Sequence, residues 1–96
     1  MKVYISGPIT GLPIKEVRRR FAKAETEILA RGHEPVNPLK NGLPESANWY
    51  EHMRADIKML VDCDAIYMIG EWWNSQGARF EWQLARDLWI DEYETH

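Results

Sequence analysis

The sequence has little cysteine, no excess of positive charge and no long hydrophobic run. Cys63 is the one cysteine among 96 residues, so no disulfide can form within the chain, and a reducing cytoplasm is the expected location. With 15 acidic and 12 basic residues the net charge is -3, which argues against binding to a nucleic-acid polymer. No apolar run approaches the roughly 18 residues of a membrane span, and no signal peptide is apparent, so we expect no membrane partner.

Metal and nucleotide motifs are also missing from the sequence. There is no Walker loop and no GxGxxG, and the three histidines are scattered without a zinc pattern. Asp62 and Asp64 lack a third ligand at a suitable spacing. We therefore expect neither a metal nor an organic cofactor.

What the sequence does contain predicts one small globular domain over residues 1–96. Hydrophobic residues make up 45% of the chain and charged residues 28%, as in folded soluble proteins. Five Trp and four Tyr are many for this length. Because so many aromatic side chains need burial, we expect a homo-oligomer, a dimer or larger.

Short apolar runs alternate with helical patterns, which predicts an α/β fold with a parallel sheet of about four strands. The predicted helices span about residues 13–31, 48–61 and 77–87. The predicted strands span residues 2–6, a short edge segment within 34–38, residues 64–70 and a possible last strand at 88–93. Asn48 followed by Glu51 is a capping signature for the second helix.

Two breaks rich in Gly, Ser and Pro follow predicted strands: "SGPITG" at 6–11 and "GEWWNSQGARFE" at 70–81. Parallel sheets bind ligands outside the carboxyl ends of their strands, so both breaks are expected to face one crevice.

Two acids are the candidate catalytic residues. Glu81 lies in the early part of the third predicted helix, where it can serve as a nucleophile, although acids there often only favour the helix dipole. Asp56 lies at the edge of an apolar stripe, where desolvation raises its pKa and suits it to proton transfer; otherwise it reaches solvent or caps a loop. Two carboxylates with divided roles are the usual apparatus of glycosidic cleavage.

Further candidates surround these acids. Ser75 and Gly77 precede or open the third helix, where N–H groups can hold a phosphate or sugar hydroxyl, or simply form a helix-entry turn. Gly7 allows either close approach of a ligand or a tight turn. Trp72 and Trp73 can stack on a planar base or pack at a contact, and Tyr4 is expected in the core.

Three segments resemble the nucleoside 2-deoxyribosyltransferase superfamily, and in particular its short members with a DUF4406 domain. They are "VYISGPITG" at 3–11, "RADIKMLVDCDAIYMI" at 54–69 and "WNSQGARFEWQLA" at 73–85, and the Ser-x-Gly-x-x-x-Glu spacing of the last is the most specific. The resemblance implies a flavodoxin-like or Rossmann-like three-layer sandwich. It also implies an enzyme that cleaves the N-glycosidic bond of a deoxyribonucleoside or its 5′-monophosphate.

The resemblance assigns roles to individual residues. Glu81 falls on the nucleophile that forms a covalent deoxyribosyl intermediate, and Asp56 on the acid that assists proton transfer or contacts the sugar. Ser75 and Gly77 fall on the part that holds the 5′ end. The residues expected to line the sugar and base are Gly7, Ile9, Thr10 and Trp73.

Several choices stay open at this stage. Thr10 stands where nucleotide-cleaving relatives can have an arginine, so nucleoside and nucleotide substrates both remain possible, as do transfer and hydrolysis. A non-catalytic nucleotide-binding module would use the same crevice. A purely structural protein would use its tryptophans at an interface.

Overall fold

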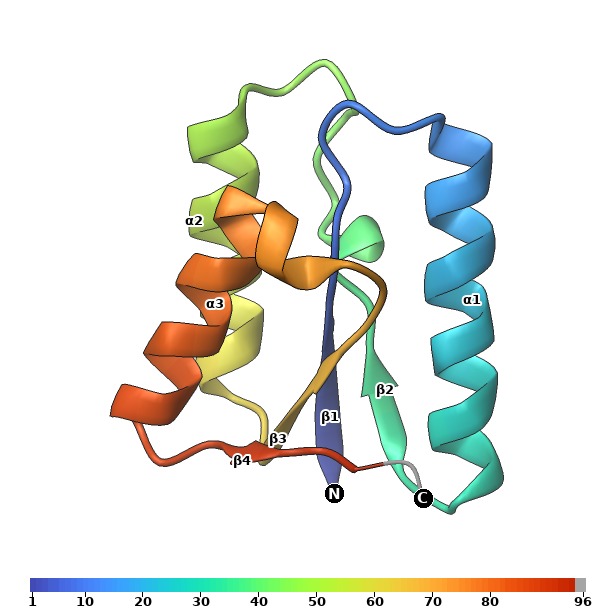
Figure 1. Ribbon diagram of the computed structural model, residues 1–96, viewed down its shortest axis with the longest axis vertical. Coiled ribbons are helices and arrows are strands. Elements are labelled where there is room, and N and C mark those ends of the chain that lie inside the picture. The colour runs from blue at the N-terminus through green and yellow to red at the C-terminus, as the bar shows by residue number, and fades with distance from the viewer. Residues whose placement is uncertain (95–96) are drawn as a thin grey trace.

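A parallel sheet of four strands in the order β2-β1-β3-β4 forms the centre of the computed structural model, which describes residues 1–94 (Figure 1). The strands are β1 (Lys2–Ser6), β2 (Glu34–Val36), β3 (Ala65–Met68) and β4 (Asp91–Glu92). The helices are α1 (Ile14–Ala30), α2 (Trp49–Val61) and α3 (Gln76–Asp87), with short 3-10 turns η1 (Pro38–Lys40) and η2 (Trp72–Asn74). The predicted small parallel sheet is confirmed.

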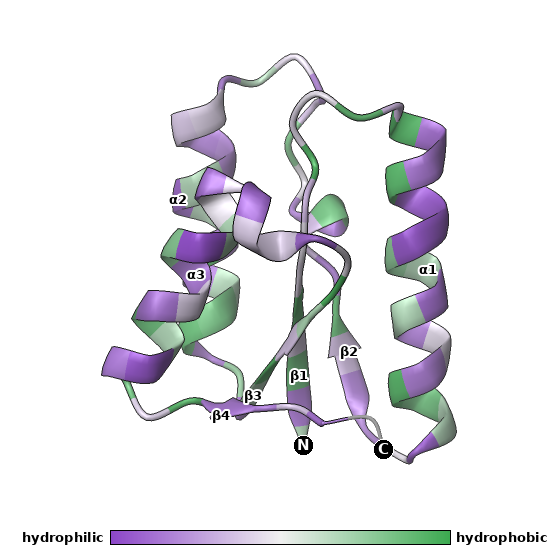
Figure 2. Ribbon diagram, in the orientation of Figure 1, coloured by the Kyte–Doolittle hydropathy of each residue, from purple (hydrophilic) through white to green (hydrophobic). Residues whose placement is uncertain are grey.

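Helices cover both faces of the sheet, which gives the predicted three layers (Figure 1). Because side chains alternate along a strand, β1 serves two cores. Val3 and Ile5 pack with Phe21 of α1, whereas Tyr4 packs with Leu60 of α2 on the other face. Figure 2 shows β1 and β3 as largely hydrophobic segments between helices banded with hydrophilic residues.

Local sequence signals set most element boundaries. Pro13 immediately precedes α1, and Gly32 follows it with a φ of +81°, a conformation that favours glycine. Asn48 accepts from the Glu51 N–H and the Glu51 side chain accepts from the Asn48 N–H, so the predicted capping box is present.

The last predicted strand is shorter than residues 88–93. Leu88 ends α3 as its C-cap, and Trp89 has a φ of +60°, so extended backbone begins only at Asp91. The alternation of apolar residues at 88–93 was therefore only partly a strand signal. The helix terminus and its turn take up the first residues of that segment.

The order of the strands places one crevice at the centre of the sheet. The chain passes from β1 to the edge strand β2 and later returns to β3 on the other side of β1. The loops after β1 and β3 therefore leave the same edge of the sheet, and the connections that follow them run to opposite sides of it, which is where open parallel sheets bind ligands.

Candidate active site

Glu81 lies on the inward face of α3 and is only 5% exposed. Its two carboxylate oxygens accept hydrogen bonds from two hydroxyls of β1: Tyr4 Oη donates to Oε2 at 2.6 Å and Ser6 Oγ donates to Oε1 at 2.7 Å. Tyr4 and Ser6 are two residues apart, so both point from the same face of the strand. The sequence placed Tyr4 in the core, and it is indeed buried, but it also holds the candidate nucleophile.

Desolvation dominates the electrostatics of Glu81. Burial raises the pKa of this carboxyl to about 7; the hydrogen bonds from Tyr4 and Ser6 oppose the rise, and the nearby charge of Asp56 adds to it. The side chain therefore exchanges its proton near neutral pH.

Asp56 lies on α2 and is 6% exposed. Asn41 Nδ2 donates to its Oδ1 at 2.8 Å. Burial raises the pKa of Asp56, while the Asn41 hydrogen bond and the neighbouring His52 partly oppose that rise. The alternative in which this carboxylate escapes to solvent is wrong.

One cavity of about 390 Å³ brings the two acids together. It is lined by the loop after β1, the segment between η1 and α2, α2 itself and the start of α3, and both Asp56 and Glu81 line it. Most of the other site residues expected from the sequence line it as well: Gly7, Ile9, Thr10, Ser75 and Gly77.

Trp73 is not part of this cavity. It lies in η2 with 56% of its surface exposed and contacts Trp72 edge-on at 6.1 Å between ring centroids. Trp72 in turn packs against Trp82 at 5.3 Å, so this aromatic group forms away from the cavity wall. The indole that does line the cavity is Trp49, at the start of α2.

The two glycines of the site lie in tight contacts with neighbouring elements. A Cβ on Gly7 would lie 2.5 Å from Ile69 Cγ1, so this glycine lets the loops after β1 and β3 meet. A Cβ on Gly77 would lie 3.2 Å from Met53 Sδ, so this glycine lets α3 approach α2 closely. The sequence left open whether a ligand or a tight turn needs glycine at position 7; in the structure Ile69 approaches Gly7 closely, and Gly7 also lines the cavity.

Ser75 is the N-cap of α3, and its Oγ accepts from the Ala78 N–H at 3.2 Å. The hydroxyl proton is still available for a ligand. The N–H groups of Gln76 and Gly77 belong to the first turn, which has no preceding helical carbonyls, so they too can donate. Backbone and side chain thus give this end of the cavity several donors.

Sequence reasoning missed several lining residues, among them Trp49, His52, Asn41, Arg18 and Glu45. Arg18 and Glu45 form an ion pair from α1 and the loop after η1, with side chains 59% and 64% exposed. Arg18 is largely solvated, yet it is the only Lys or Arg among the described residues lining the cavity.

Among residues 1–94, no group of three or more His, Cys, Asp or Glu side chains is arranged to hold a metal. Asp64 instead accepts from the Lys2 N–H at 2.8 Å at the start of the sheet. Over the same residues, no helix is both long and apolar enough to span a bilayer.

Fold and cavity together define an α/β protein with two buried carboxylates at the switch point of a parallel sheet. Residues 1–91 match the family model DUF4406, described as a domain of unknown function, and the chain belongs to this family. The resemblance of the three segments to DUF4406 members is thereby confirmed.

The fold is similar to that of a solved 2-deoxyribosyltransferase from the psychrotolerant bacterium Bacillus psychrosaccharolyticus, characterised as a biocatalyst for nucleoside synthesis. The TM-score is 0.74 and the identity 21%, over 96% of this chain and 69% of the other. The likeness at this identity establishes a shared fold. Among curated proteins, no sequence matches significantly.

Proposed function

We propose that this protein cleaves or transfers the N-glycosidic bond of a 2-deoxyribonucleoside or its 5′-monophosphate. The observation that carries the proposal is the pair of buried carboxylates, Glu81 and Asp56, that line one cavity from separate helices. The shared fold with a 2-deoxyribosyltransferase supports the same chemistry. The proposed reaction uses protein groups alone.

Glu81 is the proposed nucleophile. A carboxylate oxygen attacks C1′ as the bond from C1′ to the base nitrogen breaks, and the bonding electrons leave with the base. Tyr4 and Ser6 hold the two oxygens and favour the ionised form that attacks. Water or a second base then attacks C1′ and releases Glu81, which gives hydrolysis or transfer.

Asp56 is the proposed proton donor to the departing base. Burial raises its pKa, which keeps the proton available in less acidic solution than for a solvated aspartate. The hydrogen bond to Oδ1 fixes the carboxyl group relative to the cavity.

The remaining lining residues are proposed to bind the substrate. Ser75 and Gly77 hold the 5′ end through the donors at the start of α3. Gly7, Ile9 and Thr10 line the sugar and base. Trp49 takes the stacking role that the sequence had assigned to Trp73, because Trp49 lines the cavity and Trp73 does not.

Arg18 offers a way to separate nucleoside from nucleotide substrates. Its guanidinium lies at the cavity and is paired with Glu45. If the substrate carries a 5′-phosphate that Arg18 meets, Arg18→Ala lowers kcat/KM for the monophosphate and leaves the nucleoside unaffected. Equal effects on both substrates would contradict a phosphate contact.

The test is to incubate the purified protein with each deoxyribonucleoside and each 5′-monophosphate, with and without a second free base, and to quantify released and exchanged base by chromatography. We expect base release by the wild type, loss of at least about 100-fold in Glu81→Gln and Asp56→Asn, and wild-type rates in Glu92→Gln. Glu92 is the matched control because it is an exposed carboxylate of β4.

Intact mass spectrometry of the quenched reaction provides a second readout. A deoxyribosyl increment on the wild type, absent from Glu81→Gln, supports the covalent step. The alternative is a binding module without turnover. It would show a ligand-induced rise in melting temperature but release no free base from any substrate, and that result would refute the proposed enzymatic activity.

The proposal includes a cytoplasmic homo-oligomer. Support for the assembly comes from large hydrophobic side chains that are exposed in the single chain, including Trp73, Phe80 and Trp89. Light scattering coupled to size-exclusion chromatography measures the assembly directly, and a monomeric mass at micromolar concentration would contradict it.

A further inference from the structure

Asn41 joins two side chains of the cavity, those of His52 and Asp56, which are four residues apart on α2. Its Nδ2 lies 2.8 Å from Asp56 Oδ1 and 3.0 Å from His52 Nδ1. All three residues line the cavity. One amide group therefore touches both titratable side chains that α2 presents there.

The orientation of this amide is fixed by its other end. The Leu43 N–H donates to Asn41 Oδ1 at 2.9 Å. A flipped amide would point its NH₂ group at the Leu43 donor and its oxygen at the Asp56 carboxylate, losing both hydrogen bonds. The NH₂ group must therefore face Asp56 and His52, with one hydrogen for each.

This orientation decides the tautomer of His52. An amide nitrogen donates and does not accept, so the contact at 3.0 Å requires His52 Nδ1 to be the acceptor. In the neutral imidazole the proton then resides on Nε2. The donor that His52 offers to a ligand is thus Nε2–H.

The same amide decides which oxygen Asp56 can use. Oδ1 is occupied by the Asn41 N–H, and over residues 1–94 no side chain or backbone N–H donates to Oδ2. Oδ2 is therefore the oxygen left for a ligand in the cavity.

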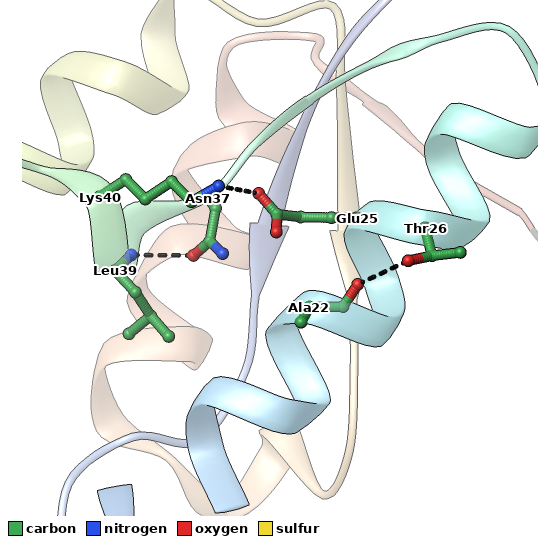
Figure 3. A network of polar contacts seen from close by, with 6 residues as sticks. All are labelled: Ala22, Glu25, Thr26, Asn37, Leu39 and Lys40. Atoms are coloured by element: carbon green, nitrogen blue, oxygen red, sulfur yellow. Dashed lines mark hydrogen bonds and ion pairs between the residues drawn. The ribbon is translucent and has the colours of Figure 1, made fainter. Parts of the chain in front are cut away.

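The backbone around Asn41 is anchored on both sides. Before it, Lys40 Nζ contacts Glu25 at 2.9 Å, which ties the η1 turn to α1, and the Leu39 N–H donates to Asn37 Oδ1 at 2.9 Å, which caps η1 at its start (Figure 3). After it, Gly42 has a φ of +86°, a turn conformation that suits glycine. The amide is held at a defined place before any ligand arrives.

We infer that Asn41 is a positioning residue that fixes the His52 tautomer and the Asp56 rotamer, so that Nε2–H and Oδ2 meet one hydrogen-bonding group of the substrate together. The catalytic meaning of this arrangement rests on the proposed function, whereas the tautomer is a property of the free protein. His52 is then a specificity residue that donates to an acceptor on the departing base or the sugar.

The first test is independent of activity. Long-range ¹H–¹⁵N correlation spectra, with His52 assigned through His52→Gln, report which ring nitrogen carries the proton once the imidazole is neutral. We expect an unprotonated Nδ1 in the wild type. A protonated Nδ1 in the neutral ring of the wild type would overturn the inference without any variant being made.

Asn41→Asp is the sharpest variant because it keeps the size and the acceptor for the Leu43 N–H but removes both N–H donors. Its carboxylate accepts from His52, so we expect the proton to move to Nδ1 and the Nδ1 resonance to shift to the protonated position. Asn48→Asp is the matched control. It introduces the same charge at the α2 N-cap, a position that does not line the cavity, and should leave the tautomer unchanged.

Kinetics complete the test. Asn41→Asp should lower kcat for base release by about 10-fold or more, because Asp56, the proposed proton donor, loses the amide that positions it. Asn48→Asp should retain wild-type rates. An unchanged tautomer or an unchanged kcat in Asn41→Asp refutes the positioning role. If the wild type releases no base from any substrate, the proposed function fails, while the spectra still decide the tautomer.

Discussion

Replacing Glu81 by Gln should make the protein more stable at alkaline pH while removing the proposed nucleophile. The pKa of Glu81 is raised from 4.5 to about 7 in the folded state, mainly by burial. At about 1.4 kcal/mol per pH unit this difference corresponds to about 3.5 kcal/mol. The side chain is 5% exposed, so little of this effect is screened by solvent.

The sign follows from which state holds the proton more tightly. Because the folded-state pKa is higher, protonated Glu81 favours folding, and this contribution is fully present below pH about 4.5 and is lost as pH rises through about 7. Gln cannot ionise, so the variant avoids this loss. One of the Tyr4 and Ser6 hydroxyls must turn to accept from the new amide, which costs about 1 kcal/mol at every pH.

The measurement is urea unfolding of wild type and Glu81→Gln at pH 4.5 and pH 8. We expect the free energy of unfolding of the variant minus that of the wild type to increase by about 3 kcal/mol from pH 4.5 to pH 8. The m-values should not change. Glu92→Gln, an exposed carboxylate change, should follow the wild type. Parallel pH dependences of wild type and Glu81→Gln would refute the claim that burial makes this carboxylate hard to ionise.

Three further predictions concern the site and its supports. Tyr4→Phe removes a hydrogen-bond donor to Glu81, so the pKa of Glu81 should rise further. The low-pH side of the profile of kcat/KM for base release then moves to higher pH, and an unmoved profile contradicts the role of this hydrogen bond. Gly7→Ala should destabilise the protein by about 1–3 kcal/mol in urea unfolding, because its Cβ would lie 2.5 Å from Ile69 Cγ1; a neutral result would mean that the two loops move apart freely. Asn48→Ala breaks the capping box and should lower the free energy of unfolding by about 1 kcal/mol, and a change below about 0.3 kcal/mol would count against the cap.

Local signals made much of the fold predictable. Helix signals act within a few residues of the chain. Examples are the Asn48 N-cap, Gly32 after the end of α1 and the helical spacing of Val17 and Phe21, so the helix bounds were predicted to within one or two positions. The alternation of short apolar runs with helices was enough to predict a parallel sheet. Residues 88–93 were less predictable, because the same apolar pattern serves the end of a helix and the start of a strand.

The sequence by itself singled out the two acids as candidates. Asp56 stands at the edge of an apolar stripe, Glu81 follows the Ser75 turn, and the family resemblance suggested their roles. Only the tertiary structure decided what surrounds them. Tyr4 contacts Glu81 across 77 positions of sequence, and Asn41 reaches Asp56 from a loop. Trp49 lines the cavity in place of Trp73. Such contacts depend on how strands and helices pack. Packing brings together residues that are distant in sequence, and the local sequence around one partner does not indicate the other.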